Sequence, residues 1–362
     1  MTRSAATAHV VLPGGVDDPA TPSGGNTYDR RLCDGLLATR DVHEIAVPGD
    51  WPRPEPPARS ALAAALAGLP GGAVVLLDGL VASAVPELLE ECRDRVRPVV
   101  LMHLPLGDET GLPPDEARAL TESEHRALHA SVAVIVTSEA AAHRIARLHG
   151  LPSERVRVAP PGVDPAPPAV PSPGGGRLLC VAAVTPRKGQ DVLVEALSRC
   201  ADVEWTCRCV GALDRAPEFA AEVTAWAGGR VAFAGPLWGA DLDAAYAAAD
   251  LFVLPSRAET YGMVVTEALA RGLPVLASDV AGVPEALGTA PGGTVPGELL
   301  PPGDPDALAA AIRRWLTDPD WRAALRAAAR ARRDTLRGWD ETVRRVAEVL
   351  DAAAAGRSED GA

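Results

Sequence analysis

Lysine, asparagine and glutamine are almost absent from the chain, which contains one of each: Lys188, Asn26 and Gln190. Nearly all of the positive charge is therefore carried by arginine. The heavy use of alanine, arginine, glycine and proline indicates a GC-rich coding background that disfavours lysine and asparagine. A rare residue kept against that background is a candidate for a special role, although chance is the alternative for any one of them taken alone.

Positive charge and long hydrophobic runs are also scarce. The formal net charge is -13, which argues against a nucleic-acid-binding protein and against a polybasic membrane anchor. The first residues, MTRSAATAHVVLPGG, lack the apolar segment of a signal peptide, and runs such as AVVLLDGLVASAV are too short or interrupted to span a bilayer. The six cysteines do not resemble a secreted disulfide framework. We therefore expect a folded cytoplasmic protein without an integral membrane segment, either free or peripheral to a membrane.

What the chain does contain is an alternation of strand-length apolar runs with helical stretches. The runs HVVLPG, AVVLLDG, PVVLMHL, VAVIVTS and RVRVA come first, and their lack of polar alternation is typical of strands buried in a parallel sheet. Residues 163–176, rich in proline and glycine, are interpreted as a linker, after which the alternation restarts. The sequence therefore predicts an α/β protein of two Rossmann-like, doubly wound parallel-sheet domains facing a central cleft.

Ligands of such folds bind at the loops that follow the strands, so these loops are where functional residues are expected. After the first strand, Gly24 and Gly25 precede a helix expected to start near Asn26 or Thr27, and glycine backbone before a helix N-terminus suits an anion. The alternative is a flexible surface turn with Asn26 as an ordinary N-cap. His103 ends a later strand and can reach the cleft, although a lone histidine is more often a polar residue with a structural role.

Two cations follow the first strand of the second domain, in VAAVTPRKGQD. Arg187 and Lys188 stand beside Gly189 at the start of a helix, where a bidentate guanidinium and a compact ammonium suit a diphosphate. The alternative is a solvated basic turn, but the position of the only lysine of the chain favours the functional interpretation. Because this site is a loop, we expect the loss of Lys188 to change stability little.

The stretch RAETYGMVVTEALARGLPVLASD places two acids, Glu259 and Glu267, eight positions apart. A helix is expected from residue 261 or 262, so that Gly262, Met263 and Val264 present free backbone N–H groups to an anion. Neither acid suits a phosphate, since like charges repel. Each can instead accept hydrogen bonds from hydroxyls at the two ends of a diphosphate, a sugar and a ribose, which indicates a site for a sugar nucleotide.

These motifs together resemble a known family. The E-x7-E spacing of Glu259 and Glu267, the RKG turn, PPGVD before the linker and RGLPVLASDVAGVPE are similar to the family 4 retaining glycosyltransferases with the GT-B fold. SGGNTYDRRL, VIVTSEAAAHRI and GWDETVRRVAEVL extend the resemblance over nearly the whole chain. The E-x7-E pattern has low specificity by itself, but the other motifs, which occur in the same order as in the family, make the combination specific.

The resemblance implies an enzyme that moves a hexose-type sugar from a nucleoside diphosphate sugar to a hydroxyl acceptor of unspecified identity. Residues 1–170 would bind the acceptor and residues 171–334 the donor, while the helix 335–354 would cross back to the first domain. The base of the donor, whether that of UDP, GDP or ADP, is not implied.

The resemblance also implies the candidate catalytic residues, which are His103, Lys188 and Glu259. His103 would lie near the transferred sugar, and Lys188 would hold the diphosphate together with Arg187. Glu259 would bind hydroxyls of the sugar, and Glu267 those of the ribose.

Five further residues are implied to bind the donor through their backbone. Gly24 and Gly25 would lie over its phosphate, and Gly262, Met263 and Val264 would meet the sugar and the phosphate. Neither a metal nor another cofactor is expected, because the sequence shows no cluster of metal ligands and its lysine and arginine can take over the role of a divalent ion.

The chain departs from the family at one position. Many members carry an arginine five residues before the lysine, where this chain has Ala183. Either Arg187 replaces that cation or the diphosphate has one cation fewer. Cys207 and Cys209 lie on one strand and are interpreted as core thiols rather than metal ligands.

Two alternative functions stay open at the level of sequence. One is another sugar-nucleotide enzyme of the same fold, such as an epimerase; a phosphorylase would need a pyridoxal-bearing lysine, and the only lysine lies in the phosphate turn. The other is a non-catalytic sugar-nucleotide-binding subunit. Hydrolysis of the donor in the absence of acceptor distinguishes an enzyme from a binding subunit.

Overall fold

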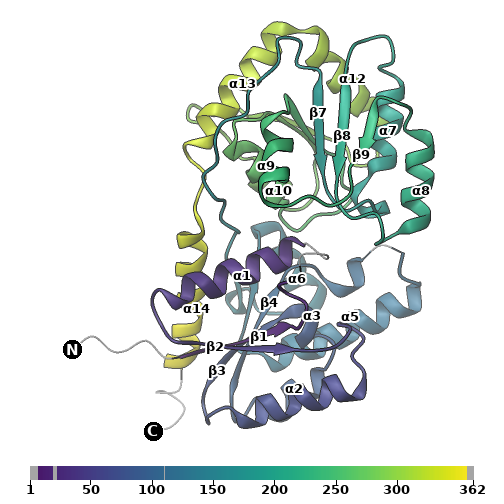
Figure 1. Ribbon diagram of the computed structural model, residues 1–362. Helices are drawn as coiled ribbons and strands as arrows, with labels where there is room; N and C mark the ends of the chain where they lie inside the picture. The colour runs from purple at the N-terminus through teal and green to yellow at the C-terminus, as the bar shows by residue number, and fades with distance from the viewer. Residues whose placement is uncertain (1–6, 19–22, 110, 357–362) are drawn as a thin grey trace. The chain divides into compact units, whose positions relative to one another are not determined.

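The chain divides into two units, each with its own parallel sheet (Figure 1). The computed structural model describes residues 7–18, 23–109 and 111–356. Unit 1 comprises Met1–Gly162 with Trp339–Ala362, and unit 2 comprises Val163–Gly338. The sequence placed the boundaries at 170/171 and 334/335, so the first part of the proline-rich stretch lies with the second unit.

Unit 1 is built on a six-stranded sheet in the order β2-β1-β3-β4-β5-β6, with all strands parallel. Its strands are β1 Ala8–Pro13, β2 Val42–Val47, β3 Val74–Asp78, β4 Arg97–Met102, β5 Ala133–Val136 and β6 Val156–Val158. Its helices are α1 Gly24–Leu37, α2 Pro56–Gly68, α3 Gly79–Ala82, α4 Pro86–Cys92, α5 Pro114–Ala130, α6 Glu139–His149 and α14 Trp339–Ala355, with short 3-10 turns η1 Leu106–Asp108 and η2 Ser153–Arg155.

The strands of unit 1 are buried on both faces, which explains their uninterrupted apolar runs. Val11 and Val75 pack in the core on one face, whereas Val10 and Leu76 pack in the core on the other. Because successive side chains of a strand point to opposite faces, a sheet covered by helices on both sides requires apolar residues at every position.

Helix α14 lies against α1 in Figure 1 and completes the second of these cores. Val346 is fully buried, and the Trp339 ring meets the Tyr28 ring edge to face with centroids 5.6 Å apart. The Thr342 hydroxyl donates to the Pro160 carbonyl at 2.7 Å. The last helix is therefore part of the unit formed by the N-terminal residues.

Unit 2 repeats the architecture with the strand order β12-β11-β10-β7-β8-β9, again all parallel. Its strands are β7 Arg177–Val181, β8 Thr206–Val210, β9 Val231–Phe233, β10 Leu251–Leu254, β11 Val275–Ser278 and β12 Gly297–Leu300. Its helices are α7 Gln190–Ser198, α8 Pro217–Trp226, α9 Gly239–Ala247, α10 Met263–Ala270, α11 Val283–Leu287, α12 Pro305–Thr317 and α13 Pro319–Arg333, with a 3-10 turn η3 Pro186–Lys188. The two doubly wound α/β domains expected from the sequence are thus confirmed.

Each sheet has one point at which the strand order reverses. In unit 1 the chain runs from β1 outward to β2 and then returns to β3 on the other side of β1. In unit 2 it runs outward through β8 and β9 and returns to β10 beside β7. The loops after the two central strands diverge at such a point and leave room for a ligand at the carboxyl ends of the strands.

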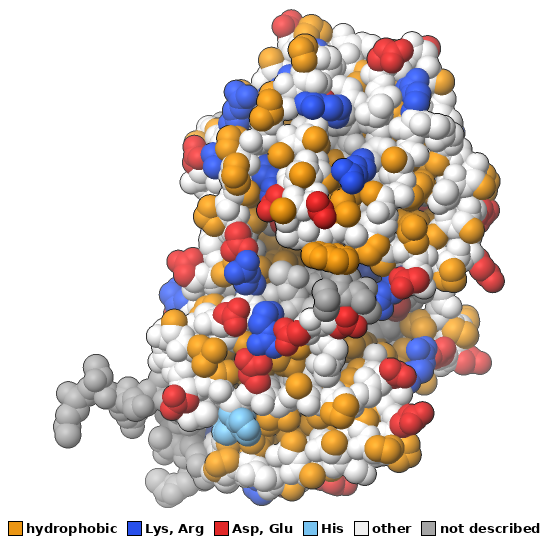
Figure 2. Space-filling view, in the orientation of Figure 1, with side chains coloured by type: hydrophobic (Ala, Val, Ile, Leu, Met, Phe, Trp, Pro, Cys, Tyr) orange, Lys and Arg blue, Asp and Glu red, His pale blue; other side chains and the backbone are white. Residues whose placement is uncertain are grey.

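Charged side chains of both signs are interspersed on the face that Figure 2 shows. Within the described ranges, no helix combines the length and the apolarity needed to cross a membrane. Cys207 and Cys209 are buried free thiols, as expected for core residues.

Candidate functional site

The predicted donor residues of unit 2 gather at its switch point. Lys188 ends the turn η3 after β7, and Glu259 lies in the loop after β10. These strands are neighbours in the sheet although they are about seventy residues apart in sequence. Their loops therefore leave the sheet side by side, and Lys188 and Glu259 meet.

A close backbone approach holds the two loops together. Gly189 adopts a left-handed conformation with φ +70°, and a Cβ there would lie 2.1 Å from the Pro255 carbonyl oxygen. The Arg257 amide donates to the Arg187 carbonyl at 2.7 Å, and the Arg257 guanidinium bonds Asp191 at the start of α7. Only glycine satisfies both the backbone conformation and the contact distance at position 189.

The Lys188 ammonium and the Glu259 carboxylate form an ion pair with Nζ 2.5 Å from Oε1. The same oxygen accepts a hydrogen bond from the Ser256 hydroxyl at 2.8 Å, and Arg187 Nη1 lies 3.9 Å from the other oxygen. Burial alone would raise the pKa of Glu259, but the charges of Lys188 and Arg187 and these hydrogen bonds outweigh it and lower the pKa. The Glu259 carboxylate is thus ionised and lies between an ammonium and a guanidinium.

The pairing changes one expectation about Lys188. The Lys188 side chain is 17% exposed and Glu259 is 8% exposed, so their contact is largely shielded from water. Removal of the lysine would leave a buried carboxylate without its main counter-charge, which is destabilising. The ion pair therefore replaces the expectation of a negligible effect with that of a measurable loss of stability.

Glu267 lies on α10 and has a different partner. Its Oε2 accepts a hydrogen bond of 2.9 Å from the hydroxyl of Tyr246, a fully buried residue of α9. Burial raises the pKa of Glu267, although the bond from Tyr246 and the charge of Arg271 oppose the increase. The two predicted glutamates therefore differ in kind, since Glu259 faces cations and Glu267 faces a phenol.

The start of α10 provides backbone donors. Gly262 is its N-cap residue and adopts a left-handed conformation with φ +90°, followed by the partly exposed Met263 and Val264. The first amides of a helix have no carbonyl partner within the helix, so this turn suits an anion. The helix begins one or two residues later than the sequence suggested.

Ala183, at the position where many family members carry an arginine, has a defined hydrogen-bond partner. The carbonyl of Ala183 accepts a hydrogen bond of 3.0 Å from the side chain of Gln190, which is fully buried. The only glutamine of the chain thus fixes the loop after β7. The sequence marked Gln190 as rare but gave no role for it.

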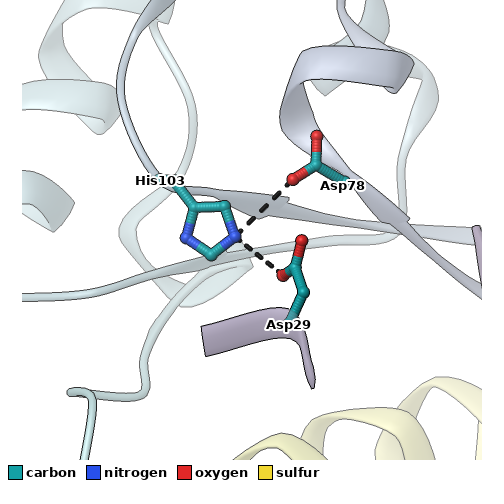
Figure 3. A group of neighbouring side chains, drawn as sticks. All are labelled: Asp29, Asp78 and His103. Carbon is teal, nitrogen blue, oxygen red and sulfur yellow. Dashed lines mark hydrogen bonds and ion pairs between the residues drawn. The ribbon is translucent and has the colours of Figure 1, made fainter. Parts of the chain in front are cut away.

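In unit 1, His103 meets two carboxylates (Figure 3). Its Nε2 atom lies 2.8 Å from Asp29 Oδ1 and 3.6 Å from Asp78 Oδ2. Asp29 belongs to α1, Asp78 ends β3, and His103 directly follows β4. We call these three residues the imidazole cluster. It lies at the switch point of unit 1, where β1 and β3 are adjacent.

The pKa values of His103 and Asp78 are both raised within the imidazole cluster. Burial by itself would lower the pKa of His103, but the charge and hydrogen bond of Asp29 and the charge of Asp78 raise it to about 9. Burial and the nearby charge of Asp29 raise the pKa of Asp78 to about 7. Two nearly inaccessible carboxylates are thus accommodated by a cationic imidazole and by partial protonation of Asp78.

The sequence missed both acids of this cluster. Asp78 had a weak signal, because a charged residue ends an otherwise apolar strand; it also caps α3 by accepting from the Leu80 amide at 2.7 Å. Asp29 had none, since it is one of several charged residues on α1 and only the packing reveals that it faces inward.

Gly25 lies against the His103 ring, where a Cβ would come within 3.2 Å of Cδ2. Helix α1 begins at Gly24, and its N-cap is Ser23, whose side chain accepts from the Asn26 amide at 3.0 Å. Helix α1 therefore begins two or three residues before the expected start near Asn26 or Thr27, and the N-cap is Ser23 and not Asn26, which the alternative interpretation had suggested. The glycine pair lies inside the first turn and allows His103 to approach it.

The imidazole cluster also bears on the question of a metal. Its three donor atoms lie within 4.8 Å of one another, a spacing that a small cation could occupy. Among the described residues this is the only such group of three or more histidine, cysteine and acidic side chains. The sequence gave no hint of it, because the three residues are far apart in the chain.

Two sequence families match the chain. The model described as "Glycosyl transferases group 1" matches residues 175–318, and the one described as "Glycosyltransferase Family 4" matches residues 81–167. D-inositol 3-phosphate glycosyltransferase of Xylanimonas cellulosilytica is 33% identical over 248 residues, which are 62% of this chain and 58% of that protein. The corresponding protein of Thermobispora bispora is 36% identical over 59% of this chain and 54% of its own length. The matched region thus spans little more than half of these relatives.

Solved structures share the fold at low sequence identity. Sucrose-phosphate synthase from Thermosynechococcus elongatus superimposes with a TM-score of 0.77 and 23% identity over 97% of this chain and all of that one. Anabaena Alr3699/HepE, solved in complex with UDP-glucose, gives a TM-score of 0.77 and 19% identity over 96% of this chain and 99% of that one. These likenesses confirm the GT-B class of fold.

The contact at Gly189 generates a prediction about stability. Gly189→Ala should lower the local free energy of opening by about 2 kcal/mol or more, because strain at a positive φ is combined with a clash against Pro255. Hydrogen–deuterium exchange of β7 and β10 peptides measures this. Gly228→Ala is the matched control, since Gly228 has φ +61° and open space around its Cβ position, and it should cost about 1 kcal/mol. Equal effects of the two substitutions would show that the clash is unimportant.

Proposed function

We propose that this chain, which belongs to the group 1 and family 4 glycosyltransferases, transfers a hexose-type sugar from a nucleoside diphosphate sugar to a hydroxyl acceptor with retention of configuration. The observation that carries the proposal is the Lys188–Glu259 pair at the switch point of unit 2. It places a lysine ammonium beside an ionised hydrogen-bond acceptor, and a sugar diphosphate requires both a cation for its phosphates and an acceptor for its hydroxyls.

The diphosphate is assigned to the cations and to the start of α10. Lys188 supplies a compact charge and Arg187 a planar one, each beside a different oxygen of Glu259. An incoming diphosphate would therefore meet two cations of different shape. The amides after Gly262 add donors aligned with the helix dipole.

The hydroxyl groups of the donor are assigned to the two glutamates. Glu259 is ionised and can only accept hydrogen bonds, so sugar hydroxyls can donate to its remaining lone pairs. Glu267 uses one oxygen for Tyr246, which leaves the other for a ribose hydroxyl. The complex of Alr3699/HepE with UDP-glucose supports a donor of this class at the level of shared fold.

The chemistry assigned to unit 2 is stabilisation of the leaving group. As the glycosidic bond breaks, negative charge grows on the diphosphate, so fixed cations help the transition state more than the ground state. In the retaining mechanism we propose, the departing phosphate accepts the proton of the acceptor hydroxyl on the same face of the sugar. The protein then contributes mainly positioning and charge.

The acceptor is proposed only as a class. The curated relatives are named D-inositol 3-phosphate glycosyltransferases, which supports a hydroxyl-bearing acceptor, but the match covers only part of those proteins. We assign acceptor binding to unit 1, where His103 is the candidate for contact with substrate. Donor turnover is proposed to need no metal, because Lys188 and Arg187 supply positive charge to the diphosphate.

The proposal predicts selective binding of one nucleoside diphosphate. In a thermal-shift series with UDP, GDP, ADP and their glucose derivatives, one base should stabilise the chain, by about 2.7 kcal/mol at a ligand concentration of about 100 Kd. The sugar derivative that binds should also be hydrolysed slowly without acceptor. Excess EDTA should leave both results largely unchanged. Absence of binding by all three bases would contradict the proposed function, and activity that is lost in EDTA and restored by Mn²⁺ or Mg²⁺ would contradict metal independence.

The two glutamates should separate binding from transfer. Glu259→Gln should retain nucleoside diphosphate affinity to within a few-fold but lose transfer, because it removes an acceptor for the sugar while leaving Lys188 in place. Glu267→Ala should weaken affinity for the free nucleoside diphosphate by about tenfold or more, equivalent to at least about 1.4 kcal/mol. Calorimetry compares both with Glu222→Ala, an exposed position on α8. Equal losses of affinity in the two variants would refute the assignment.

Lys188 should matter for both rate and stability. Lys188→Ala should lower kcat by about a hundredfold, or about 3 kcal/mol, and Lys188→Arg should restore only part of it, since a planar fork does not reproduce a compact ammonium. Arg313→Ala, which removes an exposed cation paired with Asp202, is the control. The stability lost in Lys188→Ala should be partly recovered in Lys188→Ala/Glu259→Gln, because the second change removes the unpaired charge. Near-normal kcat at saturating donor would overturn the phosphate assignment.

A further inference from the structure

Within the imidazole cluster, the two carboxylates approach only one of the two ring nitrogens of His103. Both carboxylates approach Nε2, at 2.8 Å from Asp29 and 3.6 Å from Asp78, and Figure 3 shows Nδ1 directed away from both. Among the described residues, Nδ1 has no hydrogen-bond partner. The His103 side chain is 20% exposed, whereas Asp29 and Asp78 are buried. Nδ1 is therefore the polar atom of the cluster that a ligand can use.

The contacts determine which nitrogen carries a proton. An ionised carboxylate can only accept, so the bond between Asp29 and Nε2 requires a proton on Nε2. The remaining question is whether Nδ1 is a lone pair, which could act as a base, or an N–H group, which can only donate. The charges around the ring decide between these forms.

The groups that face His103 favour the cation. The ring of Tyr28, on α1, meets the His103 ring edge to face with centroids 5.2 Å apart. Its hydroxyl donates a hydrogen bond to the Ala159 carbonyl, so Tyr28 brings no charge. Gly25, on the same helix, presents only backbone. Among the described residues, neither Asp29 nor Asp78 forms an ion pair with an arginine or lysine. The imidazole is therefore the counter-charge on which these two buried acids depend.

We propose that Asp29 is a positioning residue that holds His103 as an imidazolium in one orientation, so that Nδ1–H donates a hydrogen bond to an oxygen of the substrate. Asp78 is the second carboxylate beside Nε2. This role rests on the proposed glycosyl transfer for its purpose, although the protonation state is a property of the free protein. His103 then acts as a fixed cationic donor and not as a general base. Any acceptor proton must leave by another route, such as the departing phosphate.

The arrangement has a definite pH dependence. Since the pKa of His103 is raised to about 9, the imidazolium and the stability that it contributes are present at neutral pH and are lost as pH rises through about 9. Protonation of Asp78, whose pKa is about 7, reduces the number of carboxylates on Nε2 but leaves Asp29 in place. Catalysis that depends on Nδ1–H should therefore show a basic limb and no loss near pH 6.5, where an ordinary histidine titrates.

The first test reads the proton directly. In ¹⁵N-histidine-labelled protein, long-range ¹H–¹⁵N spectra assigned with His103→Gln should show both ring nitrogens protonated at neutral pH and titration near pH 9. Asp29→Asn should lower that titration by about 1 to 3 pH units, and Asp78→Asn by less. Asp34→Asn, an exposed acid of the same helix, is the control and should change nothing. Titration of His103 near pH 6.5 in the wild type, or no shift in Asp29→Asn, would overturn the proposal.

The second test connects the proton with turnover. With the donor that the binding series selects, the basic limb of kcat should move to lower pH in Asp29→Asn by the same amount as the titration, with KM for the donor nearly unchanged. A uniform loss of kcat at every pH would indicate a structural role only and would overturn the positioning role. If the chain binds no donor, the proposed function is contradicted. The first test then still shows whether His103 is an imidazolium, because it needs no donor.

The third test addresses a cation in the same place. Stoichiometric Mn²⁺ should leave the His103 ring signals sharp, because a protonated Nε2 that donates to Asp29 cannot act as a metal ligand. Selective broadening of these signals that is absent in the double variant Asp29→Asn/Asp78→Asn would show that the group binds a divalent ion, and the proposal would fall.

Discussion

A lysine ammonium 2.5 Å from a buried carboxylate is the contact on which the site of unit 2 depends. Removing Glu259 from water is unfavourable unless its charge is compensated, and Lys188, Arg187 and Ser256 supply that compensation. Because these partners lie on two loops that follow neighbouring strands, the pair also ties the loops together. The residues assigned to the ligand are thus the same residues that keep the switch point intact.

Unit 1 also buries carboxylates beside a cationic group. There, Asp29 and Asp78 approach the same nitrogen of His103, whereas in unit 2 Lys188 and Arg187 approach the two oxygens of Glu259. Cations suit a diphosphate, and a pair of carboxylates repels one. This contrast agrees with the assignment of the donor phosphates to unit 2 and of a neutral hydroxyl substrate to unit 1.

Most of the fold could be predicted because buried parallel strands have a simple sequence signal. Runs such as those of β3, β4 and β10 are apolar at every position, since both faces of each strand are covered. The strands β2 and β12 escaped prediction because only one residue of each is buried. Without a continuous apolar run, the composition of such a strand differs little from that of a loop.

The chain by itself determined the order of the elements and the motif residues of unit 2, because a loop after a strand and before a helix is a local feature. Lys188, Glu259 and Glu267 could be identified in this way, and so could His103. Only the tertiary structure decided which of them touch: Lys188 meets Glu259, Glu267 meets Tyr246, and His103 meets Asp29 and Asp78. Those contacts join segments that are far apart in sequence, and the order in which strands pair in a sheet, not the order in which they are synthesised, brings them together.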